Sequence, residues 1–222
     1  MLLAIDTCGN SGSIALARRE GEQITVLGTA ELAGKTYSAM LVPRLHELLE
    51  THNANMQQLE AIMVVNGPGS FTGVRVGVSA VKGLAEVLAT PVIALSRLRV
   101  LAHKAQRRYA ALDAGRGEFY FCDDDPAASR ELLLSLSELQ DELPSLAAGG
   151  ALAVCEEKVA AAFPGSRLVD PPIASDALVV AMPRLLRRDF DDLATLDGNY
   201  LRRSDAELFA KLKPGALAGK AQ

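Results

Sequence analysis

VVNGPGSFTGVRVGVSAVKGLAEVLA, residues 64–89, is the stretch that decides the fold of this chain. It begins with a short β-branched run that is typical of a buried strand, and the Gly-Pro-Gly turn at 67–69 ends that run. Ser70 or Thr72 can then cap a long helix that lasts until Thr90. The stretch therefore predicts a strand, a turn and a helix in direct succession.

The helix within this stretch is apolar over an unusually wide arc. On a helical wheel, its Gly, Ala, Val and Leu residues cover roughly 220° of the circumference, about twice what a helix lying on one sheet needs. We therefore expect burial on two sides, one against its own sheet and one against a second helix layer or a second protein. The sheet-facing side is formed by Val76, Ala80, Gly83 and Val87 or by the residues opposite them.

Gly73 and Gly77 lie one turn apart in this helix. Glycine inside a helix costs about 1 kcal/mol relative to alanine, so two of them are expected where another backbone comes close. We predict that they keep one side of the helix smooth for the helix of another protein. A central helix buried only within its own domain is an equal alternative.

The composition is that of an ordinary folded protein: 222 residues, 49% of them hydrophobic, with a net charge of −4. This length suits one large or two small domains, and the charge gives no overall positive field that would attract nucleic acid. Cys8, Cys122 and Cys155 form no C-x-x-C pair, which favours a reducing compartment over a disulfide framework or a zinc ribbon. The sequence shows no leader or long apolar span, so we expect a cytoplasmic protein without a membrane segment.

Residues 2–6, 13–18 and 24–31 are expected to form an antiparallel meander of three strands. Asp6 ends the first strand, and a turn of small residues follows it. Two kinds of site begin in this way: the phosphate-binding hairpin of actin-like ATPases and the metal carboxylate of ribonuclease-H-like nucleases. A carboxylate that accepts a hydrogen bond from its own turn is the simpler alternative.

The turn at 67–69 matches neither common phosphate loop. The lysine and hydroxyl of a P-loop are replaced by Val74-Arg75. A dinucleotide fingerprint would need a small residue at Thr72 and an acidic residue after the strand at 92–95. Amides at the helix N-terminus can hold an anion or be capped by a side chain, and capping is the favoured interpretation.

A helix predicted at 36–51 has one apolar face, although Pro43 should bend it or delay its start. The residues of that face are Tyr37, Leu41, Leu45, Leu48 and Leu49. His46 and His52 lie on different faces, so they cannot bind one metal ion from a regular helix.

After Ser96 a basic helix at 97–108 is expected to lead into a second lobe. Its five positive charges can contact phosphates or form a solvated face, and the solvated face is the more frequent case. The elements expected next are a hairpin at 109–122 and helices at 135–143, 156–163 and 175–188. The expected domains are a first lobe of residues 1–96, a second lobe of 97–190 and a C-terminal segment of 191–222.

Four motifs, in order along the chain, resemble those of one protein family. They are Ala4-Ile5-Asp6-Thr7, GPGSFTGVRVGVSAVKGLA from Gly67, the hairpin at 113–120 and Asn199-Tyr200-Leu201-Arg202. The family they resemble is TsaB, also called YeaZ, the dimerisation subunit of the bacterial machinery that makes threonylcarbamoyladenosine in tRNA. The sequence departs from the residues common in that family at Cys8-Gly9, Tyr37 and Gly115.

The resemblance implies an α/β, actin-like and ribonuclease-H-like fold of two lobes, each with a mixed sheet and flanking helices. It also implies a non-catalytic subunit that binds and activates the catalytic paralogue TsaD and helps to recruit the ATPase TsaE. The complex would modify the adenosine next to the anticodon of tRNA. The paralogue carries two metal-binding histidines on one helical face. Arg97 and Leu101 occupy those positions here, so no metal, cofactor or catalytic residue is expected.

The expected partner surface combines the helix at 73–88 with the helix at 36–51, in a bundle with the same pair of helices on a partner. Its residues are Met40, Leu41, Arg44, Gly73, Val74, Gly77, Val78, Val81 and Leu84. A homodimer through the same face is an open alternative, because a two-fold contact requires only self-complementarity.

Two other classes of protein stay open. An actin-like kinase or ATPase would place Asp6 and Asp113 around magnesium ATP. The nucleotide-binding residues would then be Asp6, Thr7, Asn10 and Ser11. A metal-dependent nuclease or peptidase would need a cluster of carboxylates or histidines, and only Asp6 is well placed for one.

Overall fold

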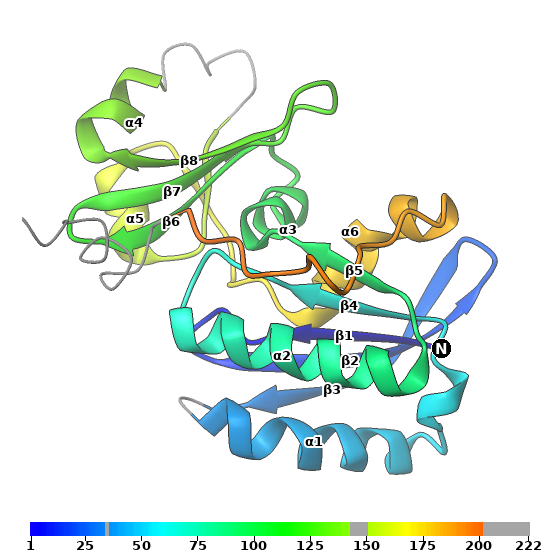
Figure 1. Cartoon of the computed structure of the whole chain (residues 1–222). Helices are drawn as coiled ribbons and strands as arrows, with labels where there is room; N and C mark the ends of the chain where they lie inside the picture. The colour runs from blue at the N-terminus through cyan, green and yellow to red at the C-terminus, as the bar shows by residue number, and fades with distance from the viewer. Residues whose placement is uncertain (34–35, 143–150, 202–222) are drawn as a thin grey trace, which may run out of the picture.

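The computed structural model describes residues 1–33, 36–142 and 151–201. These residues form two lobes, each built on a five-stranded sheet (Figure 1). The first sheet contains β1 (Leu2–Asp6), β2 (Gly12–Glu20), β3 (Gln23–Leu32), β4 (Ala61–Val65) and β5 (Val92–Leu95), in the order β3-β2-β1-β4-β5. The second contains β6 (Tyr109–Gly115), β7 (Glu118–Asp123), β8 (Arg130–Ser135), β9 (Ala153–Val154) and β10 (Arg167–Leu168), in the order β10-β9-β6-β7-β8. The helices are α1 (Tyr37–Thr51), α2 (Phe71–Leu88), α3 (Arg97–Lys104), α4 (Leu136–Glu142), α5 (Glu157–Ala162) and α6 (Ala174–Leu186), with a 3₁₀ helix η2 (Met56–Gln58).

Both sheets are mixed, as the resemblance implies. In the first, β1 pairs antiparallel with β2 and parallel with β4, so Ile5 lies between Ile14 and Val64. In the second, β6 pairs antiparallel with β7 and parallel with β9. Every residue of β1 and β4 is buried, because α1 and α2 cover one face of the first sheet and α6 covers the other (Figure 1). The antiparallel pairing of β1, β2 and β3 confirms the predicted meander.

The turn before α2 is held against the end of β1. The Ser70 amide donates to the Cys8 carbonyl at 2.8 Å, and the Ser70 hydroxyl accepts the Gly73 amide at 3.3 Å. Ser70 is therefore the N-cap of α2, whereas Thr72 lies inside the helix. The helix stops at Ala89, whose backbone is left-handed with φ 51°. The predicted succession of strand, turn and helix is confirmed.

Two glycines of α2 pack against the end of β1. Gly73 and Gly77 are buried, and a Cβ atom on either of them would overlap Thr7. The Thr7 hydroxyl donates to the Gly73 carbonyl at 2.6 Å. The close approach expected of these glycines is present, but the prediction that they face another protein is wrong, because their contact is made inside the chain. Gly83 is the exposed glycine, and a Cβ atom there would meet no described atom within 4 Å.

α6 packs on the first sheet, although residues 97–190 are predicted to form the second lobe. Its buried residues, which include Leu178 and Ala181, share one core with β1 and β4. The segment after it contacts both lobes: the Asn199 backbone amide donates to the Asn66 carbonyl at 2.7 Å, and the Asn199 side chain donates to Glu131 of β8. The period of a helix shows that one face is apolar, but not which sheet covers that face. The second lobe thus extends from α3 to β10.

The buried face of α1 is the predicted one, with Tyr37, Leu41, Leu45, Leu48 and Leu49 all buried. Strand β8 has no counterpart among the predicted elements, because its sequence, RELLLS, lacks the alternation that identifies a half-buried strand. It completes the second sheet by pairing antiparallel with β7. Among the helices of the described residues, none combines the length and apolar character that a membrane crossing needs.

Candidate functional site

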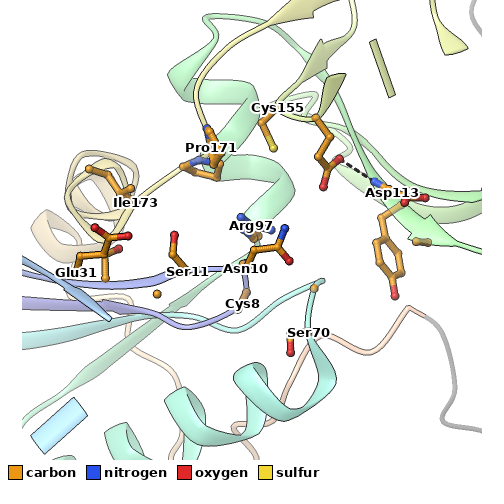
Figure 2. A pocket seen from close by; sticks show the side chains of 18 of the residues that line it. Cys8, Asn10, Ser11, Glu31, Ser70, Arg97, Asp113, Cys155, Pro171 and Ile173 are labelled. Carbon is orange, nitrogen blue, oxygen red and sulfur yellow. Dashed lines mark hydrogen bonds between the residues drawn. The ribbon is translucent and has the colours of Figure 1, made fainter. Parts of the chain in front are cut away.

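A cavity of about 700 Å³ lies between the two lobes (Figure 2). The first lobe contributes residues 8–13, which connect β1 to β2, and Ser70 before α2. The second lobe contributes Arg97 at the start of α3, the end of β6 and Glu156 before α5. A volume in this range is typical of sites for small ligands.

Asp6 and Thr7 lie beneath the turn and do not line this cavity. Asp6 is 2% exposed, and one of its carboxylate oxygens accepts the Cys8 amide at 2.8 Å. Asn10 and Ser11 do line the cavity. The structure therefore brings two of the four expected nucleotide-binding residues to the cavity. The simpler alternative for Asp6, a carboxylate that bonds its own turn, is confirmed.

Arg97 fills the space beside this turn, next to Asn10 (Figure 2). It is 8% exposed, and its Nε atom lies 3.9 Å from the second Asp6 oxygen. That separation is too long for a hydrogen bond, and Nε has no hydrogen-bond partner among the described residues. A Cβ atom on Gly9 would come within 2.7 Å of the guanidinium. The missing side chain at Gly9 therefore makes room for Arg97.

Cys8, Gly9 and Tyr37, which depart from the residues common in the resembled family, contact one another around this turn. The Cys8 thiol donates to the Val65 carbonyl at 3.0 Å, and burial raises the pKa of that thiol well above its usual value. The Tyr37 hydroxyl donates to the Gly9 carbonyl at 2.7 Å. Burial also raises the pKa of Asp6, an effect that the Arg97 charge opposes. The two hydrogen bonds, from Cys8 and Tyr37, tie the turn to β4 and to α1.

Carboxylates line the far wall of the cavity. Glu156 accepts the backbone amide of Asp113 at 3.0 Å (Figure 2), and burial raises the pKa of Glu156. Asp113 accepts the Gly115 amide at 2.9 Å and forms an ion pair with Lys158 at 2.9 Å. Asp113 thus reaches the cavity, as an actin-like ATPase would require, but Asp6, its expected counterpart, does not.

The described residues contain no group of three His, Cys, Asp or Glu side chains placed to hold a metal ion. Arg97 and Leu101 lie one turn apart on α3, at the positions that the resemblance assigns to metal-binding histidines. Arg97 faces the cavity, and Leu101 is buried in the core of the second lobe. Of the histidines, His46 lies 3.4 Å from Glu50, and His103 is exposed.

The expected partner surface is only partly at the surface of this chain. Three of its residues are accessible: Met40 is exposed, and Arg44 and Leu84 are half-buried. The others are buried in the chain itself, namely Leu41, Gly73, Val74, Gly77, Val78 and Val81. The accessible side of α2 instead carries Val76, Ala80, Gly83 and Val87. The sheet-facing side of α2 is therefore the side opposite these residues.

The basic helix α3 is neutralised by acidic neighbours. It ends at Lys104, earlier than predicted. The ion pairs of this region join Arg99 to Asp124 at 2.7 Å, Lys104 to Asp176 at 2.9 Å and Arg108 to Asp125 at 2.7 Å. The sequence gives no signal for these pairs, because each acidic partner lies outside the basic run. They pair three of the five positive charges of the basic segment with carboxylates.

The strand order, the mixed sheets and the cavity between the lobes define a protein of the actin-like, ribonuclease-H-related class. Two Pseudomonas aeruginosa structures share this fold. YeaZ is 25% identical with a TM-score of 0.68, and the match covers 90% of this chain and 99% of that chain. An uncharacterised protein with similarity to peptidase YeaZ is 28% identical with a TM-score of 0.73. This match also covers 90% of this chain and 99% of that chain. The predicted fold class is confirmed.

Sequence comparison points to the same group of proteins. The family model of TsaD, tRNA N6-adenosine threonylcarbamoyltransferase, matches residues 29–138. The tRNA threonylcarbamoyladenosine biosynthesis protein TsaB of Haemophilus influenzae is 39% identical over 126 residues, 54% of this chain and 52% of that protein. The match thus spans about half the length of this curated relative. The resemblance to the TsaB family is confirmed, because this chain is similar to TsaB proteins over about half of its length.

Proposed function

We propose that this chain is a non-catalytic subunit of a complex that makes threonylcarbamoyladenosine in tRNA. It binds and activates a TsaD-type catalytic protein, helps to recruit a TsaE-type ATPase and meets tRNA through the complex. The names of its TsaB relatives support the pathway. The accessible side of α2 supports the role of a binding subunit.

The outer side of α2 is the observation that carries this proposal. Val76, Ala80 and Leu84 are half-buried, and Val87 is 84% exposed. They lie at helical spacing around the exposed Gly83. Small apolar side chains beside a glycine allow a second helix to pack at the short interaxial distances typical of helix pairs. α1 lies beside α2 and exposes Met40 and Val42 (Figure 1), so a partner has two helices to contact.

The turn after β1 supports a binding role over a catalytic one. An ATPase of this class would need the Asp6 carboxylate to organise magnesium or water beside phosphate. Here that carboxylate is buried, accepts the Cys8 amide and faces Arg97. A guanidinium and the apolar side chain of Leu101 cannot replace two metal-binding histidines.

The variant Gly83→Arg tests the surface without weakening the fold. Arginine forms helices more readily than glycine by up to about 1 kcal/mol, and its Cβ would meet no described atom within 4 Å. The isolated variant is expected to be at least as stable as the wild type. Its affinity for the TsaD-type protein of the same organism should fall about tenfold or more, since a charged side chain then enters the interface. Threonylcarbamoylation of tRNA in a reconstituted reaction should fall with it.

Val179→Arg is the matched control, because Val179 is an exposed apolar residue on α6, across the sheet from α2. This control should leave binding and modification unchanged. Full binding and modification by Gly83→Arg would refute the proposed surface. ATP turnover by the isolated wild-type chain would instead favour the actin-like ATPase. Substitutions at Gly77 or Val81 would not serve, because both residues are buried in the core of the first lobe.

A further inference from the structure

The cavity between the lobes presents charges of both signs at separate places. Its charged lining among the described residues consists of one cation, Arg97, and three carboxylates, Glu31, Asp113 and Glu156. The Arg97 side chain starts from α3 and lies against the turn of the first lobe, whereas Glu156 lies on the wall formed by the second lobe. The Arg97 and Glu156 charges influence each other's pKa, so the two groups interact electrostatically.

The guanidinium at the positive end of the cavity is paired with Asp6 but is incompletely hydrogen-bonded. Arg97 is buried, its Nε has no hydrogen-bond partner among the described residues, and Asp6 is beyond hydrogen-bond distance. A buried guanidinium with an unsatisfied N–H group is costly, and a carboxylate is the best-matched partner of a guanidinium. Asn10 lines the same cavity and adds an amide that can donate to the same group.

The Glu156 carboxylate at the negative end is only partly hydrogen-bonded. One Glu156 oxygen accepts the Asp113 amide at 3.0 Å, and no donor within the described part of the chain bonds the other oxygen. Asp113 is paired with Lys158, so Glu156 is the carboxylate of this wall that has an oxygen available to a ligand. An ammonium group would supply both a donor and the missing charge.

We infer that the cavity binds a zwitterion, a free α-amino acid or a derivative that keeps both its ammonium and its carboxylate. The carboxylate lies on Arg97 and Asn10 of one wall, and the ammonium faces Glu156 of the other. A polyanion such as a nucleoside triphosphate meets one guanidinium and three carboxylates, which disfavours it. The inference does not depend on the proposed function, because it concerns the isolated chain.

Calorimetry and thermal unfolding of the full chain test this inference with a defined panel of compounds. The panel contains the twenty L-amino acids, their N-acetyl derivatives, their amides, inorganic phosphate and ATP. The N-acetyl derivatives lack the ammonium group, and the amides lack the carboxylate. At least one amino acid is expected to bind and to raise the unfolding temperature. Its N-acetyl derivative and its amide should each bind about tenfold more weakly or worse, because each loses one charged contact.

Glu156→Gln removes the charge and keeps an oxygen for the Asp113 amide. It should weaken amino-acid binding about tenfold and leave the N-acetyl derivative unaffected. Glu157→Gln, at the exposed neighbouring position, is the matched control and should change nothing. The double variant Asp6→Asn/Arg97→Met avoids an uncompensated buried charge, and it should unfold cooperatively but bind no amino acid.

Three results would overturn the inference. In the first, phosphate or ATP binds more tightly than every amino acid. In the second, no amino acid binds at millimolar concentration. In the third, Glu156→Gln binds the amino acid as tightly as the wild type does.

Discussion

The position of the Arg97 side chain, from the second lobe, requires a glycine at residue 9 of the first lobe. The guanidinium lies where a side chain at residue 9 would stand, and it forms an ion pair with the buried Asp6. Removing one member of a buried ion pair typically costs about 3–5 kcal/mol, because the other charge is left uncompensated. Arg97 therefore stabilises the turn after β1 in addition to lining the cavity.

The environment of Asp123 predicts how the stability of the fold depends on pH. It is buried, accepts a hydrogen bond from Arg108 at 3.0 Å and lies near Arg130. The hydrogen bond from Arg108 holds the pKa of Asp123 below its usual value. A carboxyl whose pKa is lower in the folded state stabilises the fold above its unfolded pKa, and this stabilisation is lost as pH falls through the folded pKa.

Asp123→Asn should therefore lower the free energy of unfolding at neutral pH. Its difference from the wild type should shrink once the pH falls below about 3.9, the usual pKa of aspartate. Urea unfolding at several pH values measures both effects. Asp125→Asn, which loses a more exposed partner of the same arginine, should show a smaller effect. A difference for Asp123→Asn that grew with acidification would contradict the assignment.

The sequence predicts only those parts of the candidate site whose residues are close together along the chain. Asp6 at the end of a strand and the small-residue turn after it are recognisable from consecutive residues. The contact of Arg97 with Gly9 is not, because it joins segments that are far apart in the chain. The role of Glu156 was missed for the same reason, since its partner Asp113 lies on another strand.

At the scale of secondary-structure elements, α2 has two kinds of glycine. Gly73 is in contact with the Thr7 backbone, whereas the space around Gly83 is open. Gly73→Ala should destabilise the protein by about 1–3 kcal/mol, because its methyl group forces the end of β1 to move. Gly83→Ala should stabilise it by about 0.5–1 kcal/mol through helix propensity alone.

Chemical unfolding of the two alanine variants under the same conditions is the measurement. The two variants carry the same substitution in the same helix, so opposite changes in the free energy of unfolding would come from the different surroundings of Gly73 and Gly83. Equal effects at both positions would show that the contact with Thr7 carries no energetic weight.

The elements themselves were predictable to different degrees. The meander, α1 with its buried face and the turn into α2 follow from apolar periodicity and capping residues. Strand β8 was missed because its apolar residues are consecutive. Periodicity also left open which side of α2 meets the sheet, because glycine and valine occur all round that helix.

At the scale of the whole molecule, the second lobe is an insertion in the first. The chain leaves the first sheet after β5, forms the second lobe from α3 to β10 and returns with α6 (Figure 1). A fragment of residues 1–96 therefore contains all strands of the first sheet but lacks the helix that covers one of its faces. Leu178 is fully buried there and belongs to the same core as β1 and β4.

We expect fragment 1–96 to expose apolar surface, bind the dye ANS and unfold without cooperativity, as loosely packed states do. Joining it to residues 172–222 through a flexible linker should restore cooperative urea unfolding, because α6 then covers the open face. Leu178→Glu in the joined protein should abolish that gain, since a carboxylate would be buried without a partner. Cooperative unfolding of fragment 1–96 alone would instead make residues 1–96 a complete folding unit and reduce α6 to a peripheral helix.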